Sequence, residues 1–414
     1  MDNPLVSIII PVYNGSNYLK DAIDSALAQT YPNCEILVIN DGSNDGGATE
    51  RIALAYGDRI RYFSKQNGGV ATAVNLGIKN MQGEYFAWLS HDDMYYPEKI
   101  EKQIQALREH GDMTAVVHCN YDIFDVGLQK LWHANWLNHY SLEQLTTGNF
   151  APIFLCIHGC SILFHKSHFE RVGLYDESLI ATQDSVFLFH LMRRQTSIFV
   201  EDRLFVTRMH DEQGNRTLAC HEPEYNQMFE TFCEMLTEKE MCVMCGSVYN
   251  FYDRLLSLLI SSPKAKKIIE FLMYKMQETQ LPADSLSKKY EFTSYLEKLS
   301  EGVAKNLCIF GAGKFGKKLL RDFRRRGISI DYFADNDSRK WDMLIDNVPC
   351  ISFEQLKSRK EHTLVIVSML DSDEVLKELG KNNFPYFIKK QSIDRFFYIV
   401  PPINSTDGTI TKYF

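Results

Sequence analysis

Two adjacent carboxylates, Asp92 and Asp93, follow the apolar residues 85–89, which have the composition of a buried strand. Two negative charges at the end of a buried strand are unfavourable unless something compensates them. A divalent cation does so, and hard oxygen ligands suit magnesium or manganese. A second interpretation stays open, in which Asp93 caps a helix that starts near Pro97 while Asp92 is solvated. The pair therefore predicts either a metal site or a capped turn.

The elements that must position this pair begin at the start of the chain. Residues 5–14 and 34–43 are apolar, β-branched runs that end in polar turn residues, with a helical pattern at about 16–30 between them. This arrangement is typical of a βαβ unit in a buried parallel sheet. Such a unit binds its ligand at the carboxyl ends of its strands, here residues 11–14 and 40–43. We expect a polar ligand of the nucleotide kind there, and two ordinary turns are the alternative.

Further elements follow in the same alternating order. Helical patterns at 48–56 and 70–80 flank a short strand at 60–63 and the turn Asn67-Gly68-Gly69. Glycines at such a turn allow tight bending or a close approach of the backbone to a ligand. The sequence therefore predicts a tight turn or a close approach to a ligand at residues 67–69.

Length and charge limit the classes of protein that fit. A chain of 414 residues is too long for one ordinary core, and the net charge of -8 argues against nucleic acid as the main partner. We find no leader pattern and no uninterrupted apolar run of membrane-spanning length. The ten cysteines lie largely in apolar runs, which favours buried free thiols. We therefore expect a cytoplasmic protein with two or three domains.

Six short motifs occur in an order that resembles the family 2 inverting glycosyltransferases of the A-type fold. The resemblance extends over roughly residues 5–212. The motifs are residues 7–14 (SIIIPVYN), 29–32 (QTYP), 40–43 (NDGS), 67–69 (NGG), 75–77 (NLG) and Asp92-Asp93 with 97–100 (PEKI). Each motif alone is weak, and their order makes the match specific.

The resemblance implies a site for the nucleotide of a sugar donor. It assigns the base, the ribose and the neighbouring turn to Pro11, Tyr13, Asn14, Asp41, Asn67 and Gly69. It assigns the ribose and a metal on the diphosphate to Asp92, with Asp93 beside it. Two departures stand out: Ser90 replaces the first carboxylate of the acidic motif, and Val74 stands where many members have an arginine.

The resemblance also implies a catalytic base. Residues 182–188 match a Glu-Asp pair at the start of a helix, with Gln183 in place of the glutamate and Asp184 retained. An inverting transfer needs one carboxylate to take the proton of the acceptor hydroxyl, and we assign this role to Asp184. The alternative for Asp184 is an N-cap at the helix start.

Residues 205–213 resemble a closing Arg-x-His loop of the same family. Such a loop folds over the donor diphosphate, which would bring Arg208 to the diphosphate and make His210 a further metal ligand. For Arg208, an ordinary solvated position on a surface loop is the alternative.

The second half of the chain changes character. Helical spacing dominates at 225–240, 248–260, 265–278 and 290–304. After a predicted strand at 307–310, Gly311, Gly313 and Gly316 form a Gly-x-Gly-x-x-Gly turn. The next predicted strand, at 328–334, ends in Asp335, near the position that contacts ribose in dinucleotide binders. This unit resembles small Rossmann-like domains of bacterial sugar-modifying proteins. Its role stays open among structure or assembly, nucleotide binding and NAD(P) use.

The expected protein is thus α/β, with an A-type glycosyltransferase domain at 1–215, a helical connector at 216–304, a small Rossmann-like domain at 305–393 and a tail at 394–414. The resemblance implies inverting transfer of a sugar from a nucleotide-sugar, a UDP-sugar, with Mn²⁺ or Mg²⁺. A glycan or lipid-linked acceptor in bacterial surface polysaccharide synthesis would fit. Peripheral association with the inner face of the membrane and homo-oligomer formation stay open.

Two other functions stay open. Ser90, Val74 and Gln183 are compatible with a non-catalytic sugar-nucleotide-binding or scaffold protein. The glycine-rich turn is compatible with a bifunctional enzyme whose C-terminal domain uses NAD(P). Donor turnover by the pure protein separates the first alternative from a transferase, and NAD(P)-dependent turnover would support the second.

Overall fold

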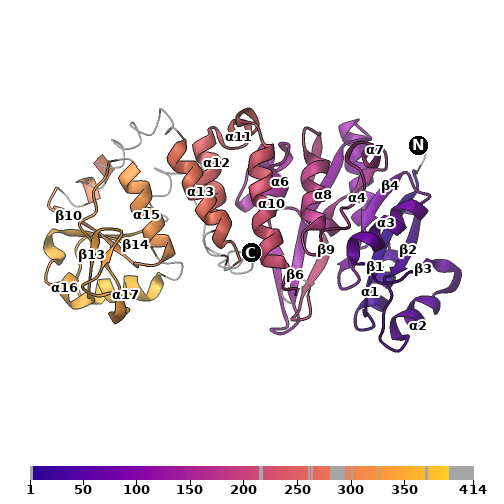
Figure 1. Cartoon of the computed structure of the whole chain (residues 1–414), viewed down its shortest axis with the longest axis horizontal. Coiled ribbons are helices and arrows are strands. Elements are labelled where there is room, and N and C mark those ends of the chain that lie inside the picture. The colour runs from indigo at the N-terminus through magenta and orange to yellow at the C-terminus, as the bar shows by residue number, and fades with distance from the viewer. Residues whose placement is uncertain are drawn as a thin grey trace. The chain divides into compact units, whose positions relative to one another are not determined.

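The computed structural model describes residues 3–213, 218–259, 262, 264–279, 294–295, 297–299, 302–325, 327–368 and 372–390. These residues form two compact units, whose elements Figure 1 labels. The N-terminal unit holds the described residues up to 244 together with 264–271, and the C-terminal unit holds 245–262 and those from 272 onward. No helix among these described residues is both long enough and apolar enough to span a bilayer.

The first sheet of the N-terminal unit has five strands in the order β3-β2-β1-β4-β8. The strands are β1 (Val6–Val12), β2 (Cys34–Asn40), β3 (Arg61–Ser64), β4 (Tyr85–Trp88) and β8 (Phe164–His165). β8 pairs antiparallel with β4, and the other pairs are parallel. Every residue of β1 is buried, as in a strand covered on both faces. Because Val12 pairs with Asn40 and Ile9 with Trp88, the carboxyl ends of β1, β2 and β4 share one edge.

Three helices follow strands of this sheet: α1 (Leu19–Leu27), α2 (Ala48–Leu54) and α3 (Val70–Asn80). The predicted helix at 70–80 has the observed bounds. The helices predicted at 16–30 and 48–56 are shorter, and α1 starts late because the amides of Tyr18 and Leu19 bond the Gly15 carbonyl in a turn. In α3, a Cβ on Gly77 would lie 2.6 Å from Cγ2 of Ile9. Glycine at 77 therefore lets α3 pack closely on β1.

A second sheet has the order β5-β9-β6-β7. Its strands are β5 (Met94–Tyr95), β6 (Val116–Asp125), β7 (Lys130–Ala134) and β9 (Ser197–Met209). β9 pairs with β6 as far as Met209, in register with Asp125. The expectation that Arg208 lies in a loop is therefore wrong, because pairing with β6 extends the strand through it. The loop starts at His210.

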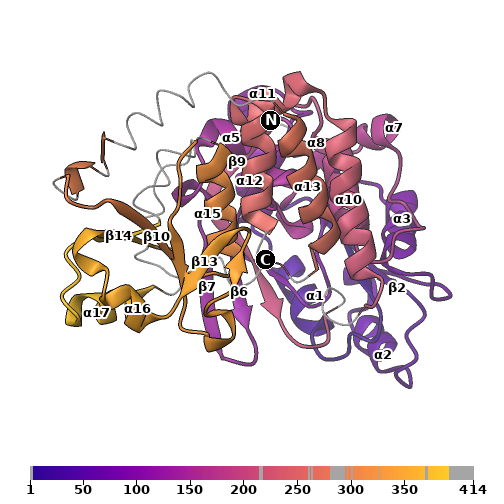
Figure 2. The same ribbon diagram turned by 60° about the vertical axis from the view of Figure 1, so that its left-hand side comes forward.

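Helices surround the two sheets of the N-terminal unit. They are α4 (Lys99–His110), α5 (Leu142–Thr146), α6 (Phe150–Ile153), α7 (His168–Val172), α8 (Gln183–Met192), α10 (His221–Met235) and α11 (Glu238–Cys245). α8 and α10 lie side by side in both views (Figures 1 and 2), and Phe189 stacks on Phe232 with ring centroids 4.1 Å apart. The end of α8 and the start of α11 are also linked, because Arg193 and Glu240 form an ion pair.

The helical spacing predicted at 225–240 is confirmed, and two helices, α10 and α11, divide this stretch. The Thr237 hydroxyl accepts the Glu240 amide at 3.2 Å, and the Glu240 carboxylate accepts the Thr237 amide at 2.9 Å. This reciprocal pair is a capping box, which starts a new helix. Two further helices are α12 (Val248–Leu259) and α13 (Lys266–Glu278), and the helix predicted at 290–304 lies largely outside the described residues.

The C-terminal unit contains a six-stranded sheet in the order β12-β13-β11-β10-β14-β15. The strands are β10 (Asn306–Phe310), β11 (Tyr332–Ala334), β12 (Leu344–Ile345), β13 (Val348–Ile351), β14 (Thr363–Val367) and β15 (Phe387–Lys389). Apart from the β12–β13 pair, its strand pairs are parallel. The parallel strands have the chain order 3-2-1-4-5, which is that of a doubly wound sheet.

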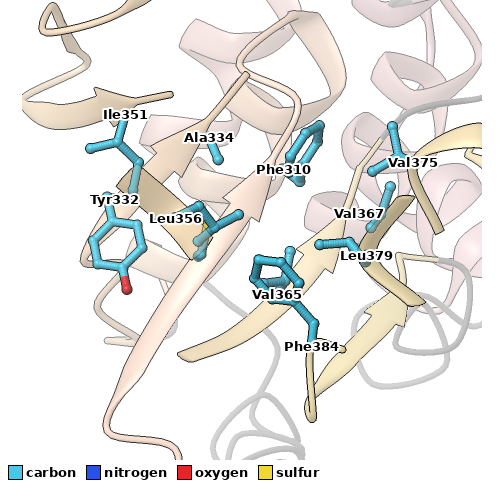
Figure 3. Close-up of a cluster of buried hydrophobic side chains, with 11 residues drawn as sticks. Phe310, Tyr332, Ala334, Ile351, Leu356, Val365, Val367, Val375, Leu379 and Phe384 are labelled. Atoms are coloured by element: carbon cyan, nitrogen blue, oxygen red, sulfur yellow. The ribbon is translucent and has the colours of Figure 1, made fainter. Parts of the chain in front are cut away.

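Helices α15 (Lys314–Arg325), α16 (Phe353–Lys357) and α17 (Asp373–Lys381) belong to the same unit. Figure 3 shows one of its hydrophobic clusters, in which Phe310 and Val365 of the sheet meet Leu379 of α17. The strand predicted at 328–334 starts only at Tyr332. The preceding residues form the turn after α15, where Gly327 has φ 66° and the Ile328 amide bonds the Phe323 carbonyl.

The glycine-rich turn before α15 yields a stability prediction. A Cβ on Gly316 would collide with the carbonyl oxygen of Gly311, whereas a Cβ on Gly313 would meet nothing within 4 Å. We expect Gly316→Ala to destabilise the C-terminal unit by about 1–3 kcal/mol, the usual cost of overpacking. Gly313→Ala, its matched control, should change the stability by less than about 1 kcal/mol.

Calorimetric melting of the full chain, with hydrogen exchange at β10 and β14, measures both variants. Equal stability of the two variants would contradict the tight packing at Gly316.

Candidate active site

The ends of β1 and β2 are joined by hydrogen bonds through Asn14. Its amide donates to the Ser43 hydroxyl at 2.9 Å, and its side chain exchanges bonds with Asn44 at 2.8 Å. Asn14 has φ 50°, a left-handed conformation that asparagine tolerates. Pro11 is buried in β1 opposite Ile39, while Tyr13 is 43% exposed. Of these predicted residues, Asn14 links the carboxyl ends of β1 and β2. Tyr13 offers an exposed aromatic side chain at the same edge of the sheet.

Asp41 follows β2 and organises the turn at 67–69. Its buried carboxylate accepts the amides of Gly68 at 3.1 Å and Gly69 at 2.8 Å, and it pairs with Lys65 at 2.5 Å. Gly69, at φ 92°, precedes the first residue of α3. The structure therefore brings the predicted Asp41 and Gly69 together, with Asn67 in the turn that joins them. It adds the cation Lys65, which the sequence analysis did not single out.

Asp92 meets His210 at the end of β4. Their Oδ2 and Nε2 atoms lie 3.1 Å apart, and the His210 ring packs against Tyr18 with centroids 5.2 Å apart. Burial acts to raise the pKa of Asp92, but the hydrogen bond from His210 and the charge of His91 outweigh it. The pKa of Asp92 therefore lies below its usual value. The structure thus brings the predicted Asp92 and His210 together. The pair offers a carboxylate and an imidazole as potential metal ligands.

Asp93 points into the protein instead. It accepts the Arg208 amide at 3.0 Å, and the Cys160 thiol donates to its Oδ2 at 3.2 Å. Burial and the charge of Asp92 raise the pKa of Asp93 to about 8. Within the described part of the chain, potential metal-ligand atoms of Asp93, His158 and Cys160 lie within 4.8 Å of one another. Both Asp93 oxygens already accept hydrogen bonds, one from the Arg208 amide and one from the Cys160 thiol.

Arg208 is buried, which rules out the solvated position considered from the sequence. Its guanidinium donates to the Asp92 carbonyl at 3.0 Å and to Asp21 of α1 at 2.7 Å, and it lies over the Tyr18 ring. The Arg208 amide also donates to Asp93. Arg208, which lies in β9, therefore holds the acidic turn after β4 in place. It supports Asp92 through the backbone of that residue.

Asp184 is the second residue of α8, and its Oδ1 accepts the Ser185 amide at 2.8 Å. The N-cap position belongs to Thr182, so the N-cap alternative for Asp184 is wrong. His158 connects Asp184 to the donor side. Burial lowers the pKa of His158, and the charges of Asp184 and Asp92 both act against this shift. The charges of the two carboxylates therefore both act on one imidazole, whose Nδ1 accepts the Cys160 amide.

The predicted asparagine motif before the base also has a structural role. Asn75 of α3 is buried, accepts the Tyr175 amide at 3.0 Å and donates to the Tyr175 carbonyl at 2.9 Å. Tyr175 in turn stacks on Phe187 of α8, with centroids 4.0 Å apart. This chain of contacts links the donor-side helix α3 to the helix that carries Asp184.

The C-terminal candidates form a separate cluster in the other unit. Asp335 accepts the Ala312 amide at 2.7 Å and the Lys340 ammonium at 2.9 Å. The carboxylate thus already binds an amide of the turn that contains Gly311 and Gly313, while Gly316 packs against Gly311. The Ala312 amide, which would be expected to bind the phosphate of a dinucleotide, therefore already has a partner within the protein.

The chain was compared with known proteins. Residues 7–173 match the model of the family described as glycosyl transferase family 2. An uncharacterized glycosyltransferase of Rickettsia typhi is 47% identical over 249 residues, which cover 60% of this chain and 78% of that protein. A Rickettsia bellii relative is 46% identical over 260 residues, 63% of this chain. This chain covers only 38% to 44% of the length of the relatives from R. bellii, R. conorii and R. felis.

A better characterised relative and a solved structure are more distant. The chondroitin synthase of Pasteurella multocida is 37% identical over 153 residues, covering 36% of this chain and 16% of that enzyme. The crystal structure of S. aureus TarS 1-349 in complex with UDP-GlcNAc superposes with a TM-score of 0.53 at 14% identity, covering 78% of this chain and 92% of that one. The N-terminal unit therefore has the A-type glycosyltransferase fold, and the chain belongs to glycosyl transferase family 2.

Proposed function

We propose that the N-terminal unit transfers a sugar from a nucleotide-sugar to an acceptor hydroxyl with inversion. The observation that carries this proposal is the pair of carboxylates at two sites: Asp92 beside His210 after β4, and Asp184 in the first turn of α8. Both are close enough to act electrostatically on His158. Asp92 lies at the sheet edge where a nucleotide is expected. Asp184 lies at the start of α8. The similar TarS structure holds UDP-GlcNAc, which supports a UDP-sugar as the donor.

Donor binding is assigned to the edge formed by β1, β2 and the turn at 67–69. Tyr13 is exposed, and its ring would cover the base. Asn14 and Asp41 fix the turns after β1 and β2, and these turns would contact the base and ribose. Lys65 and Arg208 are already paired with carboxylates. They therefore leave the diphosphate in need of another positive charge.

A divalent cation fits this need. The residues that would hold this cation are Asp92, through its carboxylate, and His210, through its imidazole. Oxygen and imidazole ligands suit Mn²⁺, whereas Mg²⁺ would bind mainly to the carboxylate. Asp93 is less suited, since both of its oxygens accept hydrogen bonds inside the protein. When bound, the cation would neutralise charge on the diphosphate leaving group.

Asp184 is the proposed general base. Its carboxylate would take the proton from the acceptor hydroxyl while that oxygen forms a bond to the anomeric carbon. The bond from this carbon to the diphosphate breaks on the opposite side, and the electron pair leaves with the nucleotide. One displacement inverts the anomeric centre. The chondroitin synthase relative supports a glycan acceptor in bacterial surface polysaccharide synthesis, and a lipid-linked acceptor on the cytoplasmic side would fit the same chemistry.

For the C-terminal unit we propose a structural or assembly role. The support is the bond between Asp335 and the Ala312 amide, which uses a donor that a dinucleotide phosphate would need. NAD(P) chemistry is disfavoured for the same reason.

Asp92→Asn tests the donor side. We expect the variant to lose most of the gain in UDP affinity that Mn²⁺ gives the wild-type chain, because the ligand charge is removed while the shape is kept. Isothermal calorimetry with UDP, with and without Mn²⁺, measures this gain. Asp202→Asn, on the exposed surface, is the control. An unchanged Mn²⁺ effect in Asp92→Asn would contradict the assignment.

Asp184→Asn tests the base. We expect turnover of the donor to fall by about two to four orders of magnitude, the usual contribution of a positioned general base. UDP affinity and melting temperature should stay at wild-type values, and Glu170→Gln on α7 serves as an exposed control. Release of UDP from a panel of UDP-sugars gives the readout. Wild-type turnover by a folded Asp184→Asn protein would rule out this base.

A further inference from the structure

The segment before α8 is held by one carboxylate from another helix. Glu224, in the first turn of α10, accepts the Ile180 amide at 3.1 Å on Oε1. Its Oε2 accepts the Ala181 amide at 2.8 Å, the Thr182 amide at 3.1 Å and the Thr182 hydroxyl at 3.2 Å. A single side chain thus binds four donors from three consecutive residues.

One of these donors, the Thr182 amide, is at the N-cap of α8, and the amides of Ile180 and Ala181 belong to the two residues before it. The amides at the N-terminus of a helix have no partner within it and carry a partial positive charge. Thr182, at the N-cap of α8, makes no side-chain cap hydrogen bond to the helix. Glu224 supplies the negative group instead, from more than 40 residues further along the chain.

The charge of Glu224 is maintained by the same contacts. Burial acts to raise the pKa of Glu224, but the hydrogen bonds from Ala181, Ile180 and Thr182 outweigh it and leave the pKa below its usual value. Glu224 is therefore ionised at neutral pH, and its carboxylate is committed to this segment. The Cys220 thiol is a further neighbour of the carboxylate.

Asp184 comes two residues after Thr182, in the first turn of α8. Its place is determined by where α8 begins, and that point is fixed by the bonds to Glu224. We propose that Glu224 is a positioning residue that sets the Asp184 carboxylate for proton transfer. This inference rests on the proposed function, because it requires Asp184 to act as the base.

The proposal makes α10 part of the catalytic arrangement. The pairing of Phe189 with Phe232 aligns the two helices further along. The Glu224 carboxylate then fixes the position of the start of α8 relative to α10. A small displacement of a reacting group lowers the rate strongly, while binding of the donor elsewhere is unaffected.

Glu224→Gln tests the proposal. The amide is uncharged and one of its two polar groups is a donor, so it cannot accept all four bonds. We expect kcat, with the UDP-sugar that the wild-type chain turns over fastest, to fall by about 10- to 100-fold. UDP affinity should stay within about twofold of the wild-type value. Glu222→Gln, in the same turn and exposed, is the matched control and should leave both values unchanged.

A double-mutant cycle separates positioning from a general structural role. In the Asp184→Asn background, we expect Glu224→Gln to lower kcat by no more than about twofold, because the group that it positions is already inactive. An equal loss in both backgrounds, or wild-type kcat in Glu224→Gln, would overturn the proposal. If Asp184→Asn itself leaves kcat unchanged, the proposed base fails and the positioning role falls with it.

Thr182→Val provides a second test if Glu224→Gln does not fold. This variant removes one of the four donors and leaves the carboxylate charge in place. We expect kcat to fall severalfold with UDP affinity unchanged, and an unchanged kcat would overturn the proposal.

Discussion

The two adjacent carboxylates after β4 cannot both be ionised in a buried turn, and the site depends on how the fold separates them. The end of β9 and the loop after it provide this separation, because the Arg208 amide of β9 binds Asp93 and His210 of the loop binds Asp92. The pKa of Asp93 rises to about 8 while that of Asp92 falls, so one group is mostly neutral inside and the other is charged beside His210. The long pairing of β9 with β6 fixes this arrangement, since it determines where Arg208 lies.

The other half of the site is built on α8, with contacts from α3 and α10. Asn75 holds Tyr175, which stacks against α8, and Glu224 holds the backbone where α8 begins. Glu224 on α10 is engaged in these bonds, whereas Asp184 in the first turn of α8 accepts the Ser185 amide on one oxygen. The two carboxylates therefore differ in role, since Glu224 holds the backbone before α8 and Asp184 is the proposed base.

Local patterns in the sequence predicted β1 to β4 of the first sheet and α3, because apolar strands and small-residue helices carry their signal in neighbouring residues. They did not predict the short antiparallel strand β8. Arg208 was placed in a loop because the partner that extends β9 is β6, which lies far away in the chain. Lys65 and Glu224 were missed for the same reason, since their importance comes from contacts with distant residues. The division between α10 and α11 could have been found, because Thr237 and Glu240 have the spacing of a capping box.

In the proposed mechanism, Asp184 activates an acceptor oxygen for a single displacement at the anomeric carbon. Water can serve as the acceptor in the slow hydrolysis of the donor, which avoids the need to know the natural acceptor. Proton NMR of an α-linked UDP-sugar incubated with the full chain and Mn²⁺ identifies the anomer released before mutarotation. A single displacement releases the β anomer first, and initial release of the α anomer would contradict this mechanism.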